Sequence, residues 1–186
     1  MSALPQRKLF TVDEYDTMIK AGVFDGKERV ELIEGEFVKK MTQGDLHIGC
    51  INFLTRFFSI NYNENVLVSI QNAVKINIFS APEPDVALLR FRSDFYSTGK
   101  AQPEDILLLI EVADSTVSSD RRVKIPLYAG AEVPEVWLVN LPRKIIEIYT
   151  EPKNGKYQIV RKATKSETIS PKMIADLSVK VADVVG

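Results

Sequence analysis

Short runs of apolar residues, separated by polar segments, recur along most of the chain. Their lengths and spacing predict strands over residues 65–71, 73–78, 84–90, 106–112, 135–140 and 144–150. Within the second of these, Val74, Ile76 and Ile78 alternate with polar residues, as in an antiparallel strand with one solvated face. The run 106–112 is apolar on both faces apart from Glu111, which is typical of a strand buried inside a sheet.

Amphipathic helices are expected over three further segments, 10–22, 46–62 and 118–131. Thr11 and Glu14 form the capping-box pattern at the start of the first helix. Asp45 is placed to cap the second helix. Pro126 should bend the third helix, because proline lacks the backbone hydrogen-bond donor and clashes with the preceding turn.

Two hairpins complete the pattern. Residues 29–40 predict two short strands around a turn at Glu34-Gly35, and 156–163 is expected to pair with 167–170. Residues 91–105 are polar and irregular, so a loop over one end of the sheet is expected there. The order of helix, hairpin, helix, strands, helix and strands indicates an α/β fold (an α+β mixed sheet) in a single domain over 1–186.

The composition excludes several classes of function but does not identify one. The 186 residues have a net charge of −1 and a pI of about 6.0, so no global positive field favours non-specific binding of nucleic acid. Cys50 and His47 are the only cysteine and histidine, which excludes an internal disulfide and metal sites built from several such residues. Without a bilayer-spanning apolar run or a signal-peptide pattern, a cytoplasmic protein with no membrane partner is expected.

Two acidic residues lie inside strand patterns, where an unpaired carboxylate is costly. Asp85 opens the strand in PEPDVALL, and Glu111 lies near the end of the strand in LLLIEVADS. Neighbouring strands are about 4.8 Å apart, so carboxylates in register on one face can share a cation. Mg²⁺ is usually held by one or two carboxylates and water. The pair therefore predicts a divalent-cation site, although a turn role for Asp85 and a basic partner for Glu111 fit the pattern equally well.

Three further residues are candidates for the same site. Glu31 lies in VELIEGE, where alternation puts Glu31 and Glu34 on opposite faces, so either acid can face the site. Lys124, on the helix after the Glu111 strand, can reach back to stabilise negative charge or orient a water molecule. His47, near the start of the long helix, can contact the same cleft. The plainer interpretations are a solvated hairpin, a surface lysine and a helix-start residue.

These segments, taken in order, resemble a known family. VELIEGE, the histidine of the next helix, PDVALL, LLLIEVADS, DRRVKIPLY and EVWLVN are similar to the Uma-type family of restriction-endonuclease-like proteins, long catalogued as a domain of unknown function. Proline-aspartate in one strand and glutamate in the next also resemble the PD-(D/E)xK nuclease superfamily. The resemblance extends from about Phe10 to Tyr149. It implies a restriction-endonuclease-like core, a central mixed β-sheet flanked by helices, with a metal site at one sheet end.

The resemblance also implies roles for the candidate residues. Asp85 and Glu111 match the family's metal ligands, which would hold Mg²⁺ or Mn²⁺. Glu31 matches the family's early glutamate, as a third acid at the metal. His47 matches its histidine, and Lys124 matches a lysine on the helix that follows the glutamate strand.

The chain departs from the pattern at three places, and one of them is Asp114-Ser115-Thr116, where family members often carry Ser-Pro after the glutamate. Ala113 stands where the superfamily has its strand lysine, so catalysis requires Lys124 in its place, and Asn140 stands where a strand-end aspartate is common. The expected function is that of a metal-dependent endonuclease that hydrolyses nucleic acid, with DNA favoured over RNA, as a homodimer by analogy with restriction enzymes. The alternatives are a catalytically silent, dimeric binding or regulatory module that keeps the nuclease fold, and a hydrolase of small phosphorylated metabolites.

Overall fold

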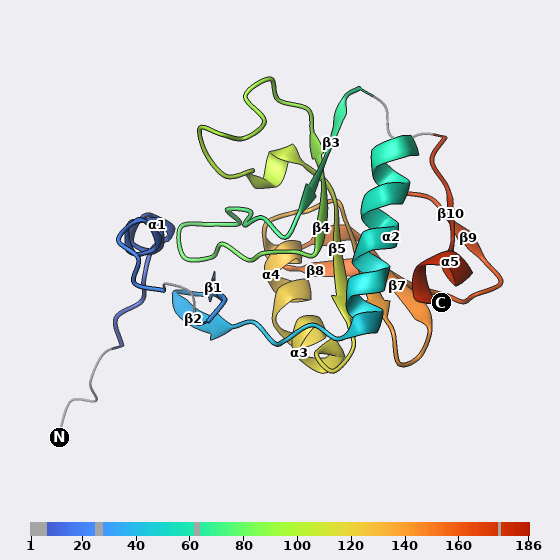
Figure 1. Cartoon of the computed structure of the whole chain (residues 1–186), viewed down its shortest axis with the longest axis horizontal. Coiled ribbons are helices and arrows are strands. Elements are labelled where there is room, and N and C mark those ends of the chain that lie inside the picture. Colours follow the sequence, from blue (N-terminus) through green and yellow to red (C-terminus); the bar gives the residue numbers. More distant parts are fainter. Residues whose placement is uncertain (1–6, 25–27, 62–63, 175) are drawn as a thin grey trace.

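A six-stranded mixed sheet forms the centre of the molecule, with strand order β3-β4-β5-β6-β7-β8 (Figure 1). Its strands are β3 (Val66–Ile70), β4 (Val86–Arg90), β5 (Ile106–Ala113), β6 (Glu135–Asn140), β7 (Ile145–Lys153) and β8 (Lys156–Ala163). Neighbouring strands are antiparallel except for β5 and β6, which are parallel. The mixed α/β fold predicted from the sequence is confirmed. The computed structural model describes residues 7–24, 28–61, 64–174 and 176–186, so the first six residues and Tyr62 of the expected long helix lie outside it.

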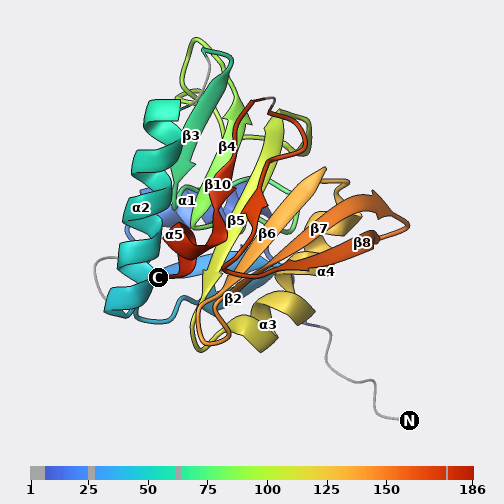
Figure 2. The ribbon, with the colours of Figure 1, turned by 90° about the vertical axis from the view of Figure 1, so that its right-hand side faces the viewer.

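Helices cover both faces of this sheet, and each face has its own core (Figure 2). The helices are α2 (Asp45–Asn61) and α5 (Val181–Val185) on one face, and α3 (Val117–Arg122) and α4 (Lys124–Gly130) on the other. Alternate side chains of β5 point to opposite faces, so Leu108 and Ile110 join the first core while Leu109 and Ala113 join the second. By the same alternation Glu111 faces the side of α3 and α4.

A small N-terminal unit lies beside the main sheet. It consists of α1 (Val12–Lys20) and the antiparallel strands β1 (Val30–Ile33) and β2 (Glu36–Lys39), packed around a separate apolar cluster. The capping box of Thr11 and Glu14 is present as predicted. A bridge between Leu32 and Ala81 joins β1 to the segment that leads into β4. The unit thereby brings Glu31 to the end of the main sheet.

The expected strand over 73–78 is absent from the described structure. Val74 and Ile76 are buried, as the alternation suggests, but Ile78 is 60% exposed. The backbone N–H of Val74 bonds to the carbonyl of Pro82, and that of Ile76 to Ser80, so the segment folds back on itself. Both edges of β4 are already paired, with β3 and β5, which leaves no place in the sheet beside it. Alternation therefore predicted the burial of Val74 and Ile76 correctly, and the burial of Ile78 and the strand pairing wrongly.

The helix expected over 118–131 is divided into α3 and α4. The break lies at Val123, with φ −110° and ψ −60°. Because Pro126 has no N–H, it cannot bond to the carbonyl of Arg122, four residues earlier, and its ring clashes there. The bend predicted within one helix is thus a break between two helices. The long helix also differs slightly, since it begins at Asp45 itself and the N–H of Ile48 bonds to the carbonyl of Gly44.

The last hairpin was predicted with the wrong partner. Strand β8 pairs with β7 through a turn at Asn154 and Gly155, whose φ angles of 53° and 72° suit a tight hairpin turn. Residues of the expected partner form β9 (Thr168–Ile169), which pairs with β10 (Val179–Lys180). Within 91–105 the loop contains a short 3₁₀ helix, η1 (Pro103–Asp105). None of the described helices is long and apolar enough to cross a bilayer.

Candidate active site

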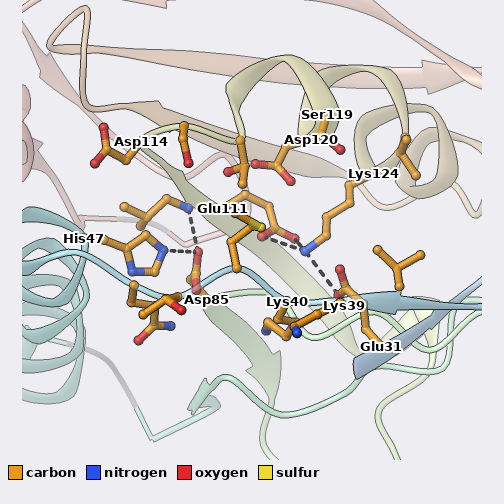
Figure 3. A pocket seen from close by; sticks show the side chains of 18 of the residues that line it. Glu31, Lys39, Lys40, His47, Asp85, Glu111, Asp114, Ser119, Asp120 and Lys124 are labelled. Carbon is orange, nitrogen blue, oxygen red and sulfur yellow. Dashed lines mark hydrogen bonds and ion pairs between the residues drawn. The ribbon is translucent and has the colours of Figure 1, made fainter. Parts of the chain in front are cut away.

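A cavity of about 220 Å³ opens between the N-terminal hairpin, the start of α2 and the α3–α4 junction (Figure 3). All the residues that the sequence singled out line it: Glu31, His47, Asp85, Glu111 and Lys124. They come from β1, α2, the start of β4, β5 and α4. The pairing of Val86 with Ile110 puts Asp85 beside Glu111 at the end of two neighbouring strands.

Asp85 is buried and held by three donors. Its Oδ2 accepts the N–H of Val112 at 2.9 Å and lies 3.2 Å from Nε2 of His47. Its Oδ1 accepts Nε2 of Gln71 at 3.2 Å. Burial would raise the pKa of Asp85, but the hydrogen bond and charge of His47, the Val112 N–H and the charge of Lys124 hold that pKa below its ordinary value of 3.8. The carboxylate is therefore ionised and fixed in orientation.

His47 touches the site through one ring nitrogen only. Its Nδ1 is buried and has no hydrogen-bond partner among the described residues. A buried polar atom without a partner costs free energy, so this position of the ring has a compensating reason. The bond to Asp85 supplies that reason, because it adds a donor to a buried carboxylate.

Glu111 is bound by a lysine and a tyrosine. Both carboxylate oxygens lie 3.2 Å from Nζ of Lys124, and Oε1 also accepts the hydroxyl of Tyr128 at 2.6 Å. Burial raises the pKa of Glu111 to about 8, and the charge of Lys124 opposes this rise while Asp85 and other acids add to it. The protein's own groups thus compensate this buried acid only in part.

Lys124 is buried between two acids. Besides Glu111, its Nζ contacts Oε2 of Glu31 at 3.2 Å, and its residue exposure is only 8%. Burial would lower the pKa of Lys124, but the charges of Glu111, Glu31, Asp120 and Asp85 raise it well above its ordinary value. The lysine therefore keeps its charge. It reaches Glu111 from the face to which the side chain of Ala113 also points, so an ammonium group is present near the slot of the missing strand lysine.

The alternation in β1 left two acids as candidates, and the structure selects between them. Glu31 is buried in the cavity wall, whereas Glu34 is exposed and lies outside the lining of this cavity. Oε2 of Glu31 also accepts the backbone N–H of Glu83 at 3.0 Å. The N-terminal unit therefore contributes a fixed carboxylate to the site.

Comparison with known proteins identifies the family and the fold of the chain. A family model named Uma2, described as "Putative restriction endonuclease", matches residues 12–182. The chain belongs to the Uma2 family. Its fold is similar to the crystal structure of a "putative nuclease belonging to DUF820" from Anabaena variabilis ATCC 29413, with a TM-score of 0.64 and 14% identity over 95% of this chain and 97% of that one. Among proteins with curated descriptions, none matches the chain.

The Uma2 site contains side chains that the sequence did not single out. Tyr128 is fully buried, as a core aromatic would be, but its hydroxyl points at Glu111. Gln71, at the end of β3, has a left-handed φ of 53°, and both its backbone and side-chain N–H groups bond to Asp85. Asp120 lines the cavity, and burial raises its pKa. The helical spacing of Lys124 and Tyr128 was the one available signal.

The donor set of this Uma2 site suits a hard divalent cation. Asp85 and Glu111 supply carboxylate oxygens, and a cation would offset the burial and the neighbouring acids that raise the pKa of Glu111. Within the described ranges, no group of three or more His, Cys, Asp or Glu side chains is arranged to enclose a metal. Because Mg²⁺ is commonly held by one or two carboxylates and water, the two acids fit a hydrated site and not an all-protein cage.

Proposed function

We propose that the chain is a metal-dependent nuclease that hydrolyses phosphodiester bonds in nucleic acid at this cavity. The observation that carries the proposal is the meeting of Asp85, Glu111 and Lys124 from three separate elements in one cavity. Membership of a family described as "Putative restriction endonuclease" supports it. Residues 1–186 would form one restriction-endonuclease-like domain, with a cytoplasmic location as its expected setting.

Each residue of the site has a role in this proposal. Asp85 and Glu111 would hold Mg²⁺ or Mn²⁺, which when bound lowers the pKa of water and polarises a phosphate. Glu31 would join them directly or through water. Lys124, a buried ammonium group, would orient the attacking water or neutralise charge that develops on the phosphate. His47 would fix the orientation of the Asp85 carboxylate through Nε2.

A second candidate is a catalytically silent binding or regulatory module. It is favoured by the hydrogen bonds of Glu111, whose oxygens already have protein partners in Lys124 and Tyr128. Ala113 also favours the silent module, because it stands where the superfamily has its strand lysine. In either function nucleic acid is the proposed partner, with DNA ahead of RNA, and a homodimer remains a prediction by analogy.

A Mn²⁺ titration followed by calorimetry separates the two candidates. The nuclease should bind Mn²⁺, and Asp85→Ala and Glu111→Ala should each lose both Mn²⁺ binding and cleavage of oligonucleotides while staying folded. Glu147→Gln is the matched control, because Glu147 is also a buried glutamate but lies outside the cavity lining. Wild-type protein that neither binds Mn²⁺ nor cleaves DNA or RNA would favour the silent module.

A further inference from the structure

Lys40 lies in the wall of the cavity, on the side of the N-terminal hairpin. In that hairpin Glu31 is paired with Val38, so Lys40, two residues further on, has the same facing as Glu31. Its side chain is only 13% exposed, whereas that of its neighbour Lys39 is 62% exposed and paired with Glu28 at the surface. Lys40 is thus a largely desolvated cation that lines the same cavity as the proposed metal ligands.

The charges around Lys40 differ from those around Lys124. Nζ of Lys40 donates to the backbone carbonyl of Glu83 at 2.9 Å and to its carboxylate at 3.2 Å. The same carboxylate receives Arg29 at 3.2 Å, so one acid faces two cations. On the other wall Lys124 is one cation between two acids. The wall at Lys40 therefore has an excess of positive charge, and the wall at Lys124 an excess of negative charge.

This difference matters for an anionic substrate. The cavity is lined by five acids, Glu31, Asp85, Glu111, Asp114 and Asp120, and its buried lysine is already shared between two of them (Figure 3). A phosphodiester that approaches the acids needs a cation that those acids do not neutralise. A poorly hydrated ammonium group interacts with an anion more strongly than a fully exposed one does. Lys40 meets both requirements.

We propose that Lys40 is the substrate-phosphate ligand of this site, a role that rests on the proposed nuclease function and extends it. Among the described residues its ammonium group has two acceptors, both on Glu83, and a lysine has three donor hydrogens. The third hydrogen binds a non-bridging oxygen of the phosphodiester. Glu83 holds the ammonium group in place, and Arg29 shares the charge of the Glu83 carboxylate, so that Lys40 keeps positive charge for the substrate.

The test compares Lys40→Met with Lys8→Met in full-length protein, because Lys8 is an exposed lysine that pairs with Glu14 and lies outside the cavity lining, whereas Lys39 lines the cavity beside Lys40. The first readout is binding of a short fluorescein-labelled single-stranded oligodeoxynucleotide, measured by anisotropy in metal-free buffer, where no cleavage occurs. Lys40→Met should weaken binding about tenfold, as expected for the loss of one charge-assisted hydrogen bond. The slope of log affinity against log salt should fall by about 0.7, the value for one phosphate contact on a single strand. Lys8→Met should stay within about twofold of wild type.

Two further measurements make the outcome specific. Lys40→Arg, which keeps the charge, should restore most of the binding, and thermal melting should show all variants folded. Equal binding by Lys40→Met and Lys8→Met, or no binding by wild type, overturns the role of Lys40. If binding depends on Lys40 but wild type neither binds Mn²⁺ nor cleaves, the nuclease function fails and Lys40 is the phosphate ligand of a binding module.

Discussion

Two buried glutamates of this protein have the same kinds of partner and different surroundings. Glu111 is bound by Lys124 and by the hydroxyl of Tyr128. Glu147, on β7, accepts Nε and a terminal nitrogen of Arg121 at 3.1 and 2.6 Å, together with the hydroxyl of Tyr149 at 2.7 Å. Each is thus a carboxylate with one cation and one tyrosine. The residue types alone would assign both clusters the same role.

The pKa values of these two glutamates are shifted in opposite directions. Burial would raise the pKa of Glu147, but the hydrogen bonds from Arg121 and Tyr149 outweigh burial and lower that pKa. At Glu111 burial outweighs Lys124, and the pKa rises to about 8. Arg121 binds the single carboxylate of Glu147 through two nitrogens. Lys124 instead contacts two acids, Glu111 and Glu31, and has further acids near it. What distinguishes the candidate site is therefore a buried carboxylate whose charge its neighbours compensate only in part, next to a cavity. The combination of carboxylate, cation and tyrosine does not distinguish it, because both clusters have it.

The largest difference between the two clusters is expected when the cation of each is removed in turn. Lys124→Met should lower kcat for oligonucleotide cleavage by about a hundredfold or more, since it deletes a preorganised donor at the reacting phosphate. Arg121→Met should leave kcat unchanged, because Arg121 does not line the cavity. Single-turnover kinetics in Mn²⁺ measures both.

A Mn²⁺ titration of the same variants serves as the control. Lys124→Met should keep Mn²⁺ affinity, because both carboxylates remain and the competing ammonium group is gone. Equal losses of kcat in the two variants would mean that Lys124 acts only through folding and that the two clusters have the same role.

A smaller effect is expected from the two tyrosine hydroxyls. Tyr128→Phe removes the 2.6 Å bond that orients Glu111 and should lower kcat/KM by about tenfold, with a loss of stability of about 1 kcal/mol. Tyr149→Phe should cost a similar amount of stability and leave kcat/KM unchanged. Urea denaturation and steady-state kinetics give both numbers. A positioning role for Tyr128 requires weaker Mn²⁺ binding in Tyr128→Phe only, which a purely structural role would not produce.

The acids of the site were predictable because they interrupt apolar strands. Asp85 and Glu111 stand out in PDVALL and LLLIEVADS whatever the tertiary structure is. Glu31, His47 and Lys124 needed the family resemblance, because their own patterns equally fit exposed residues. Their side chains meet only after a separate hairpin, α2 and α4 dock at one end of the sheet. That docking depends on contacts between residues distant in sequence.

The residues that were missed have little local signal of their function. For Tyr128 it is the helical spacing from Lys124, and Lys40 has none, so their neighbours in space are what distinguish them from Tyr149 and Lys39. The two errors in the fold have different origins. Alternation in 73–78 does not indicate which strands pair. The β7–β8 pairing did have a local signal in the sequence, Asn154-Gly155, that the sequence prediction overlooked.

The smallest expected effect concerns the pH dependence of stability at Glu147. Its pKa in the folded protein lies below the ordinary value of 4.5, so the unfolded chain binds the proton more readily. The carboxylate therefore contributes stability above about pH 4.5 that is lost as the pH falls through its lowered folded pKa. Glu147→Gln should be less stable than wild type at pH 7 by about 1 kcal/mol, because part of Arg121 is exposed to solvent. Urea denaturation from pH 7 to pH 3 should show the two stabilities converging, and a constant difference would mean that Glu147 stabilises the fold by packing and not by charge.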